Sequence, residues 1–112
     1  MDTDVSSVAS ALGELTHTEL RALINATNDV PEAAPGLLAW IEIACVWELN
    51  RRRGTACELQ PLGAMIPPEE EAASVSTATR MRSTFEQENR ALELLSLLDA
   101  ILELLPGGGH EH

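Results

Sequence analysis

The sequence predicts an all-α protein, with three to four helices forming one small domain over residues 1–105. Apolar residues recur at three- and four-residue spacing along most of the chain, which is the spacing of a helix face. Helix start and stop signals divide these stretches. With one Phe, two Trp and no Tyr, the core must be aliphatic. The glycine-rich residues 106–112 are expected to form a flexible tail.

A short first helix is expected to end at Gly13, after a start at Asp4, whose side chain can cap a helix N-terminus. The apolar positions of this segment are spaced by three and four residues, as on one face of a helix. They are Val5, Val8, Leu12 and Leu15.

The second helix has the clearest start signal in the chain. Thr16 and Glu19 have the spacing of a capping box, in which each side chain accepts a hydrogen bond from the other residue's backbone N–H. The helix should therefore begin at His17. Residues 28–31 end it, because the residue before a proline is disfavoured in the helical region.

The third helix is predicted from Pro35 to about Arg53. Three arginines at its C-terminal end complement the helix dipole, and Gly54 suits the left-handed position that follows a helix. Residues 37–49 are apolar on every side except for two glutamates, which is the pattern of a buried helix. In so small a chain, such a helix needs either all the other helices or a second subunit around it.

A long C-terminal helix follows a surface loop over residues 55–68 and can start anywhere between Pro68 and Ser76. A straight helix from Ser76 to Leu105 would be about 45 Å long, whereas a globule of this size is roughly 34 Å across. The apolar face also changes phase between Phe85 and Leu92. Either the helix bends there, or its halves bury opposite faces against different partners.

The second half of this helix carries a broad apolar face, with leucine and isoleucine side chains over an arc of about 180°. We expect it to be an interaction face that packs on a second copy of the chain or on a partner helix. Its residues are Leu94, Leu98, Ile101, Leu102 and Leu105.

Two glutamates interrupt the apolar third helix, and a buried carboxylate can mark a functional site. Glu48 has arginines at i+3 and i+4 with which it can pair. Glu42 has no charged partner on its own helix, so it is the candidate buried polar residue. The alternative functional hypothesis is a small ligand-binding or catalytic domain with its site between helices near Glu42, Trp40 and Trp47.

Other residues that could carry chemistry have simpler interpretations. His17 is expected at the surface, and a tail with His110, Glu111 and His112 lacks the spacing that places two imidazoles on one helix face. Cys45 is expected to be a buried thiol. The sequence has no nucleotide-binding glycine motif and no nucleophile elbow. We expect no catalytic residue, no metal and no other cofactor.

Charge and hydropathy restrict the partners. Seven Lys and Arg against 18 Asp and Glu give a formal net charge of -11, which disfavours direct binding to nucleic acid or to an anionic membrane surface. The longest nearly apolar run, residues 37–47, is too short for a membrane span, which needs about 20 residues. The N-terminus has no secretory signal pattern, so a cytoplasmic location is expected.

These observations favour a non-enzymatic protein that acts through protein–protein contacts, as a binding or regulatory protein. A homodimer is expected, and a protein partner with a basic or helical surface is the other candidate. The acidic surface suggests a basic partner surface, such as that of a nucleic-acid-binding protein, although acidity also favours solubility.

Overall fold

The computed structural model describes residues 5–28, 34–55, 58–59, 62, 66–90 and 92–105, and all the regular structure in these ranges is helical. The predicted all-α class is confirmed. The connector at residues 29–33 and the predicted tail at residues 106–112 lie outside the described ranges. The elements are α1 (Val5–Gly13), α2 (His17–Thr27), α3 (Pro35–Arg52), a 3₁₀ turn (Pro68–Glu70), α4 (Glu71–Gln87) and α5 (Leu92–Leu104).

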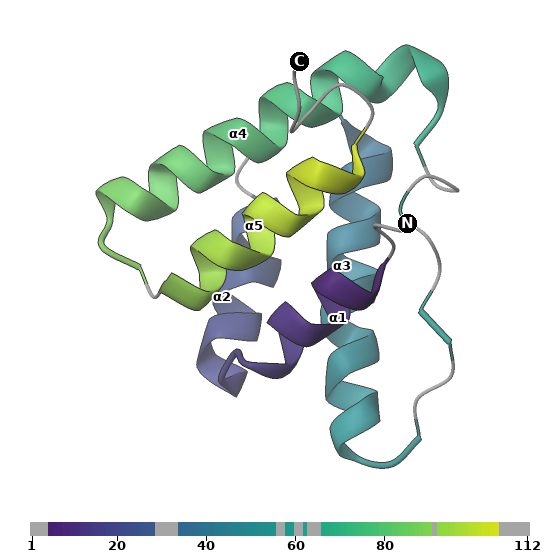
Figure 1. The fold of residues 1–112 in the computed structure, drawn as a ribbon, viewed down its shortest axis with the longest axis vertical. Coiled ribbons are helices and arrows are strands. Elements are labelled where there is room, and N and C mark those ends of the chain that lie inside the picture. The colour runs from purple at the N-terminus through teal and green to yellow at the C-terminus, as the bar shows by residue number, and fades with distance from the viewer. Residues whose placement is uncertain are drawn as a thin grey trace.

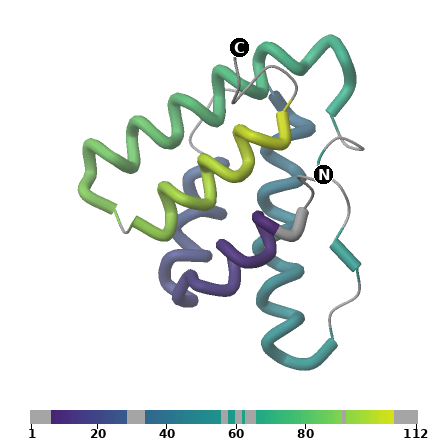
Figure 2. Tube along the Cα trace, in the orientation of Figure 1, coloured from purple at the N-terminus to yellow at the C-terminus, as the bar shows by residue number. Residues whose placement is uncertain are grey.

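The helices form two layers. Helices α4 and α5 lie side by side as an antiparallel pair, and α1 packs along the other side of α5 (Figure 1). Helix α3 crosses behind these three helices, with α2 packed against it. The trace in Figure 2 shows α4 turning back into α5 at one edge of the molecule. The whole has a radius of gyration of 13.0 Å and extents of 37 × 31 × 25 Å.

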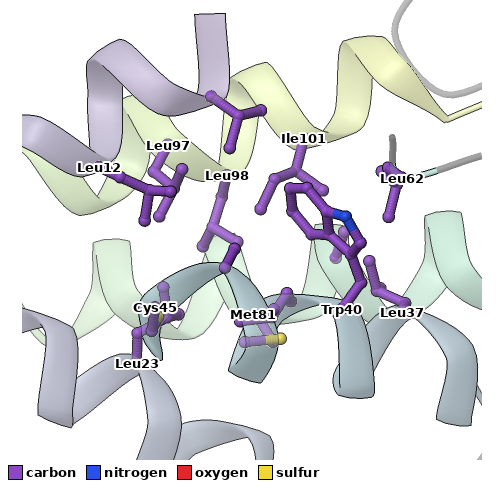
Figure 3. Close-up of a cluster of buried hydrophobic side chains, with 14 of the residues drawn as sticks. Leu12, Leu23, Leu37, Trp40, Cys45, Leu62, Met81, Leu97, Leu98 and Ile101 are labelled. Carbon is purple, nitrogen blue, oxygen red and sulfur yellow. The ribbon is translucent and has the colours of Figure 1, made fainter. Parts of the chain in front are cut away.

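The core is mainly aliphatic, as predicted, and each of the five described α-helices contributes to it. Its largest member is Trp40 of α3, which is fully buried; it lies beside Leu37, Leu62 and Ile101 in Figure 3. Leu62, which lies between α3 and α4 in the sequence, is also buried in this core. The core therefore includes residues that no helical periodicity could assign to it.

The predicted helix ends are confirmed where strong local signals occur. The Thr16 hydroxyl accepts a hydrogen bond from the Glu19 N–H at 3.1 Å, and Glu19 accepts one from the Thr16 N–H at 2.8 Å. At the end of α3, Gly54 adopts a positive φ of 84°. The Thr55 N–H reaches back to the Asn50 carbonyl at 3.0 Å, which gives the Schellman closure of a helix C-terminus.

The long C-terminal helix of the prediction is two helices, which raises the helix count in the described ranges from the predicted four or fewer to five. Asn89 is the left-handed residue of the break, with a φ of 58°. The Arg90 N–H donates to the Phe85 carbonyl at 3.0 Å, and the Asn89 N–H donates to the Glu86 carbonyl at 3.1 Å. The predicted change of apolar phase before Leu92 therefore corresponds to a Schellman turn.

The first turn of α3 depends on a distant residue. Its N-cap, Ala34, has no side chain that could accept a hydrogen bond, and Pro35 follows at the first helical position. The Gly36 N–H instead donates to the Glu70 carboxylate at 3.1 Å, across 34 positions of sequence. A negative charge at a helix N-terminus is also favourable to the helix dipole. This contact fixes the start of α4 against the start of α3.

The left-handed backbone at Asn89 should decide which residues the turn between α4 and α5 tolerates. Asn89→Val is expected to lower the free energy of unfolding by about 1 kcal/mol, because a side chain branched at Cβ is strained at positive φ. Asn89→Gly should leave it unchanged or raise it slightly. Urea unfolding followed by circular dichroism measures both. Equal losses in the two variants would show that the asparagine side chain, rather than the backbone angle, matters.

Thr84→Val is the matched control for this experiment. Thr84 is exposed within α4, so the same side chain enters an ordinary helical position. The free energy of unfolding should change there by less than about 0.5 kcal/mol.

Candidate functional site

The residues predicted to form an interaction face on α5 lie mostly inside the folded single chain. Four of these five residues are at most 1% exposed, and Leu102 is partly buried. The cause is the turn after α4, which lets α4 cover one side of the wide apolar arc while α1 covers the other. The buried four are Leu94, Leu98, Ile101 and Leu105.

Glu42 is exposed, which corrects the prediction of a buried carboxylate at this position. It lies on the outer side of α3, whereas Trp40, Ile41 and Ala44 point into the core. The structure therefore does not bring Glu42 and Trp40 together in one site. The alternative hypothesis of a ligand-binding or catalytic site near Glu42 and Trp40 assumed that these two side chains share a cavity, which this arrangement does not provide.

The buried carboxylate of α3 is Glu48, which has no exposed surface. The Arg51 guanidinium binds it through two hydrogen bonds of 2.9 Å, one to each carboxylate oxygen. Arg52 adds a third, from Nε to Oε2 at 2.6 Å. The predicted pairing of Glu48 with arginines at i+3 and i+4 is confirmed, and both arginines bind the same carboxylate.

The two arginines keep Glu48 ionised in spite of its burial. Burial alone would raise the pKa of the Glu48 carboxyl, because it removes water from the charged form. The hydrogen bonds and positive charges of Arg51 and Arg52 outweigh this effect, so the pKa lies below its ordinary value. Glu48 is therefore a structural anion whose acceptor capacity is used by its own helix.

Arg52 also connects α3 to the end of α1. Its Nη2 donates to the backbone carbonyls of Leu12, at 3.2 Å, and of Leu15, at 2.5 Å. The last carbonyls of a helix have no partner within the helix, and α1 has no basic residue in its own last turn. One guanidinium thus pairs with the buried carboxylate and closes the C-terminus of another helix.

The Cys45 thiol is also structural. It is fully buried, as predicted, and burial together with the negative charge of Glu42 raises its pKa to about 12. Because the thiolate is the nucleophilic form, this cysteine is not activated at neutral pH. Cys57 lies outside the described residues.

The outer side of α3 carries the exposed apolar surface of this helix. Ile43 is 45% exposed and Val46 is 46% exposed, one turn apart. At 100° per residue, they share an arc of about 100° with four further residues that are exposed or partly buried. We call this surface the α3 stripe; its members are Ala39, Glu42, Ile43, Val46, Asn50 and Arg53.

The α3 stripe was missed at the level of sequence, because α3 was predicted to be buried on all sides. An apolar pattern that continues around a helix does not indicate which side faces the core. The spacing within the stripe, with residues at 39, 43, 46, 50 and 53, is the alternation of four and three residues found in helices that pack on another helix. That spacing is the signal that could have identified it.

The stripe has opposite charges toward its two ends. Glu42 lies in the N-terminal half of α3, and Arg53 is the residue that closes its C-terminus. Both are exposed, and neither forms an ion pair with another of the described residues. The α3 stripe thus has two exposed apolar residues at its centre, with an acidic residue toward the N-terminus of α3 and a basic residue at its C-terminus.

Because Glu48 is paired in its ionised form, the free energy of unfolding should depend on pH. The pKa of Glu48 in the folded protein lies below its unfolded value of about 4.3. Its contribution to the free energy of unfolding is therefore complete above about pH 4.3 and is lost as the pH falls through the folded pKa. At pH 7, Glu48→Gln should lower the free energy of unfolding by about 3 kcal/mol. The curves of the two proteins should converge below about pH 4, which urea unfolding at several pH values would measure.

Glu103→Gln is the matched control, since it makes the same change at an exposed helical position outside the α3 stripe. Its stability should follow that of the unchanged protein at every pH, within about 0.5 kcal/mol. The general effect of acid on this highly charged chain cancels when the free energies of unfolding of two variants are compared at the same pH. Parallel curves for Glu48→Gln and the unchanged protein would refute an ionised, paired Glu48.

The described residues contain neither a metal-binding cluster nor a membrane-spanning helix. In that part of the chain no three His, Cys, Asp or Glu side chains are placed to hold a metal ion, and no helix is long and apolar enough to cross a membrane. His110, Glu111 and His112 lie outside it. Comparison of the chain with models of protein families, with curated proteins and with solved structures finds no match.

Proposed function

We propose that this is a non-enzymatic protein that acts by binding another protein chain, and that it binds through the α3 stripe. The observation that carries the proposal is the pair Ile43 and Val46, each nearly half exposed on successive turns of α3. Single apolar side chains are common on protein surfaces, but a contiguous strip at helix-packing spacing is typical of an interaction site. This site replaces the leucine face of α5, which the chain covers itself.

The chemistry of the remaining groups supports a binding role over a catalytic one. The acceptor capacity of Glu48 is used by Arg51 and Arg52, and the high pKa of Cys45 keeps its thiol protonated. Glu42 is exposed and stands apart from the buried Trp40. General acid–base catalysis needs a titratable group within reach of a bound substrate, and these groups do not converge on one place.

Charge helps to define the kind of partner. The net charge of -11 repels other acidic surfaces at long range and limits non-specific contacts. The α3 stripe itself carries one acidic and one basic residue, so it is locally balanced. A partner is therefore expected to present an apolar helix face with charges of its own at the two ends, which narrows the earlier expectation of a basic or helical surface.

Site-specific photocrosslinking tests the proposal. A benzophenone amino acid at position 46, in protein added to an extract of the source cells, should give one main adduct, identified by mass spectrometry as a second copy or as another protein. The adduct should be lost when Ile43→Asp is added, because a charge in the strip opposes burial. Circular dichroism should show that the helices remain.

Position 96 is the matched control for the crosslinking. Ser96 is exposed on the outer side of α5, away from the α3 stripe. The same crosslinker there should give no comparable adduct. Equal yields at positions 46 and 96, or an adduct that Ile43→Asp does not affect, would contradict binding through the stripe.

A further inference from the structure

We infer that the partner of the α3 stripe is a second copy of this chain, packed antiparallel across a two-fold axis near Val46. This inference rests on the proposed function and names its partner. It also moves the predicted dimer contact from the leucine face of α5 to the outer side of α3. The pattern of charge and size along the stripe supports this inference.

The stripe is charge-complementary to itself only in the antiparallel arrangement. Glu42 and Arg53 are 11 residues apart, which is about 16 Å along the helix and nearly a whole number of turns, so both project from the same side. With the axis at Val46, position 42 of one copy lies opposite position 50 of the other, and Arg53 is three residues, about 4.5 Å, further along. The long glutamate and arginine side chains can span that offset. A parallel pair would oppose glutamate to glutamate and arginine to arginine, which is unfavourable.

Two-fold symmetry makes both ion pairs form together. In an isologous contact, the same surface of each subunit is used, so each residue pair occurs twice. With the axis near Val46, the two valines meet at the centre, and Ile43 packs one turn away on either side. Within their own chain, Glu42 and Arg53 form no ion pair with any described residue. The dimer would provide each of them with an ion-pair partner.

The sizes of the stripe residues fit a close helix–helix contact. Ala39 and Val46 are small, and the spacing of residues 39, 43, 46 and 50 matches the seam along which paired helices interlock. The basic side chains next to the stripe do not interfere, because Arg51 and Arg52 are held by Glu48. The contact therefore adds apolar burial and two ion pairs without breaking the buried cluster.

Sedimentation equilibrium at about 0.15 M salt tests the inference, since this salt screens the repulsion between two acidic chains beyond about 8 Å. The average mass should rise with concentration from the 12.1 kDa of one chain toward twice that value. Val46→Asp should weaken the dimer at least about tenfold, because it places two carboxylates at the axis. Its helical content should not change, since position 46 is exposed.

Charge reversal identifies the orientation. Glu42→Arg alone, and Arg53→Glu alone, should each raise the dissociation constant about tenfold, since each opposes like charges twice. The double variant E42R/R53E should return it to within about threefold of the original value. Restoration by the double swap supports the antiparallel pair of identical chains, whereas a single reversal without effect, or a double swap without rescue, overturns it.

The outcomes separate this inference from the proposed function. A chain that remains a monomer at every concentration overturns the dimer. If the crosslinker at position 46 then captures one identified protein in a manner that depends on Ile43, the interaction role survives with a different partner. If position 46 gives no specific adduct at all, both proposals fail.

Discussion

The rest of the structure depends on how α3 buries an ionised carboxylate. Glu48 lies on the side of α3 that faces the core, where the other residues are apolar. A buried charge is tolerated only when it is paired and hydrogen-bonded. Arg51 and Arg52 meet this requirement from the same helix. Arg52 then extends the cluster to the carbonyls of Leu12, in the last turn of α1, and of Leu15, just after it, so that α1 is held against α3 while its other side packs on α5. One ion cluster thus connects the two layers of helices.

The sequence was most informative where a structural signal is local. The capping box at Thr16 and Glu19 placed the start of α2, and Gly54 placed the end of α3, because each involves hydrogen bonds within a few residues. The break between α4 and α5 was located by the change of apolar phase, even though Asn89 is neither glycine nor proline. Such signals do not depend on which other helix packs nearby, so they could be predicted without the fold.

Burial depends on the neighbours of each helix, and here the sequence was insufficient. Glu42 and Glu48 interrupt the same apolar helix, and only the tertiary arrangement decides which one points inward. The two arginines after Glu48 were the available signal, since a buried carboxylate needs partners close at hand. The leucine face of α5 was correctly identified as apolar, but α1 and α4 of the same chain cover it. The α3 stripe was missed for a different reason. Because α3 is apolar on nearly every side, the sequence did not indicate which side of the helix is exposed.

The hydrogen bond from Gly36 to Glu70 has a consequence for the order in which the chain folds. Helix pairs that follow each other in sequence, such as α2 with α3 and α4 with α5, close short loops and lose little chain entropy. The first turn of α3 has no local cap, so its N–H group is satisfied only when Glu70 arrives from 34 positions away. We therefore expect that turn to be completed late in folding, when Glu70 comes against it, and to be the first part of α3 to open in the native protein.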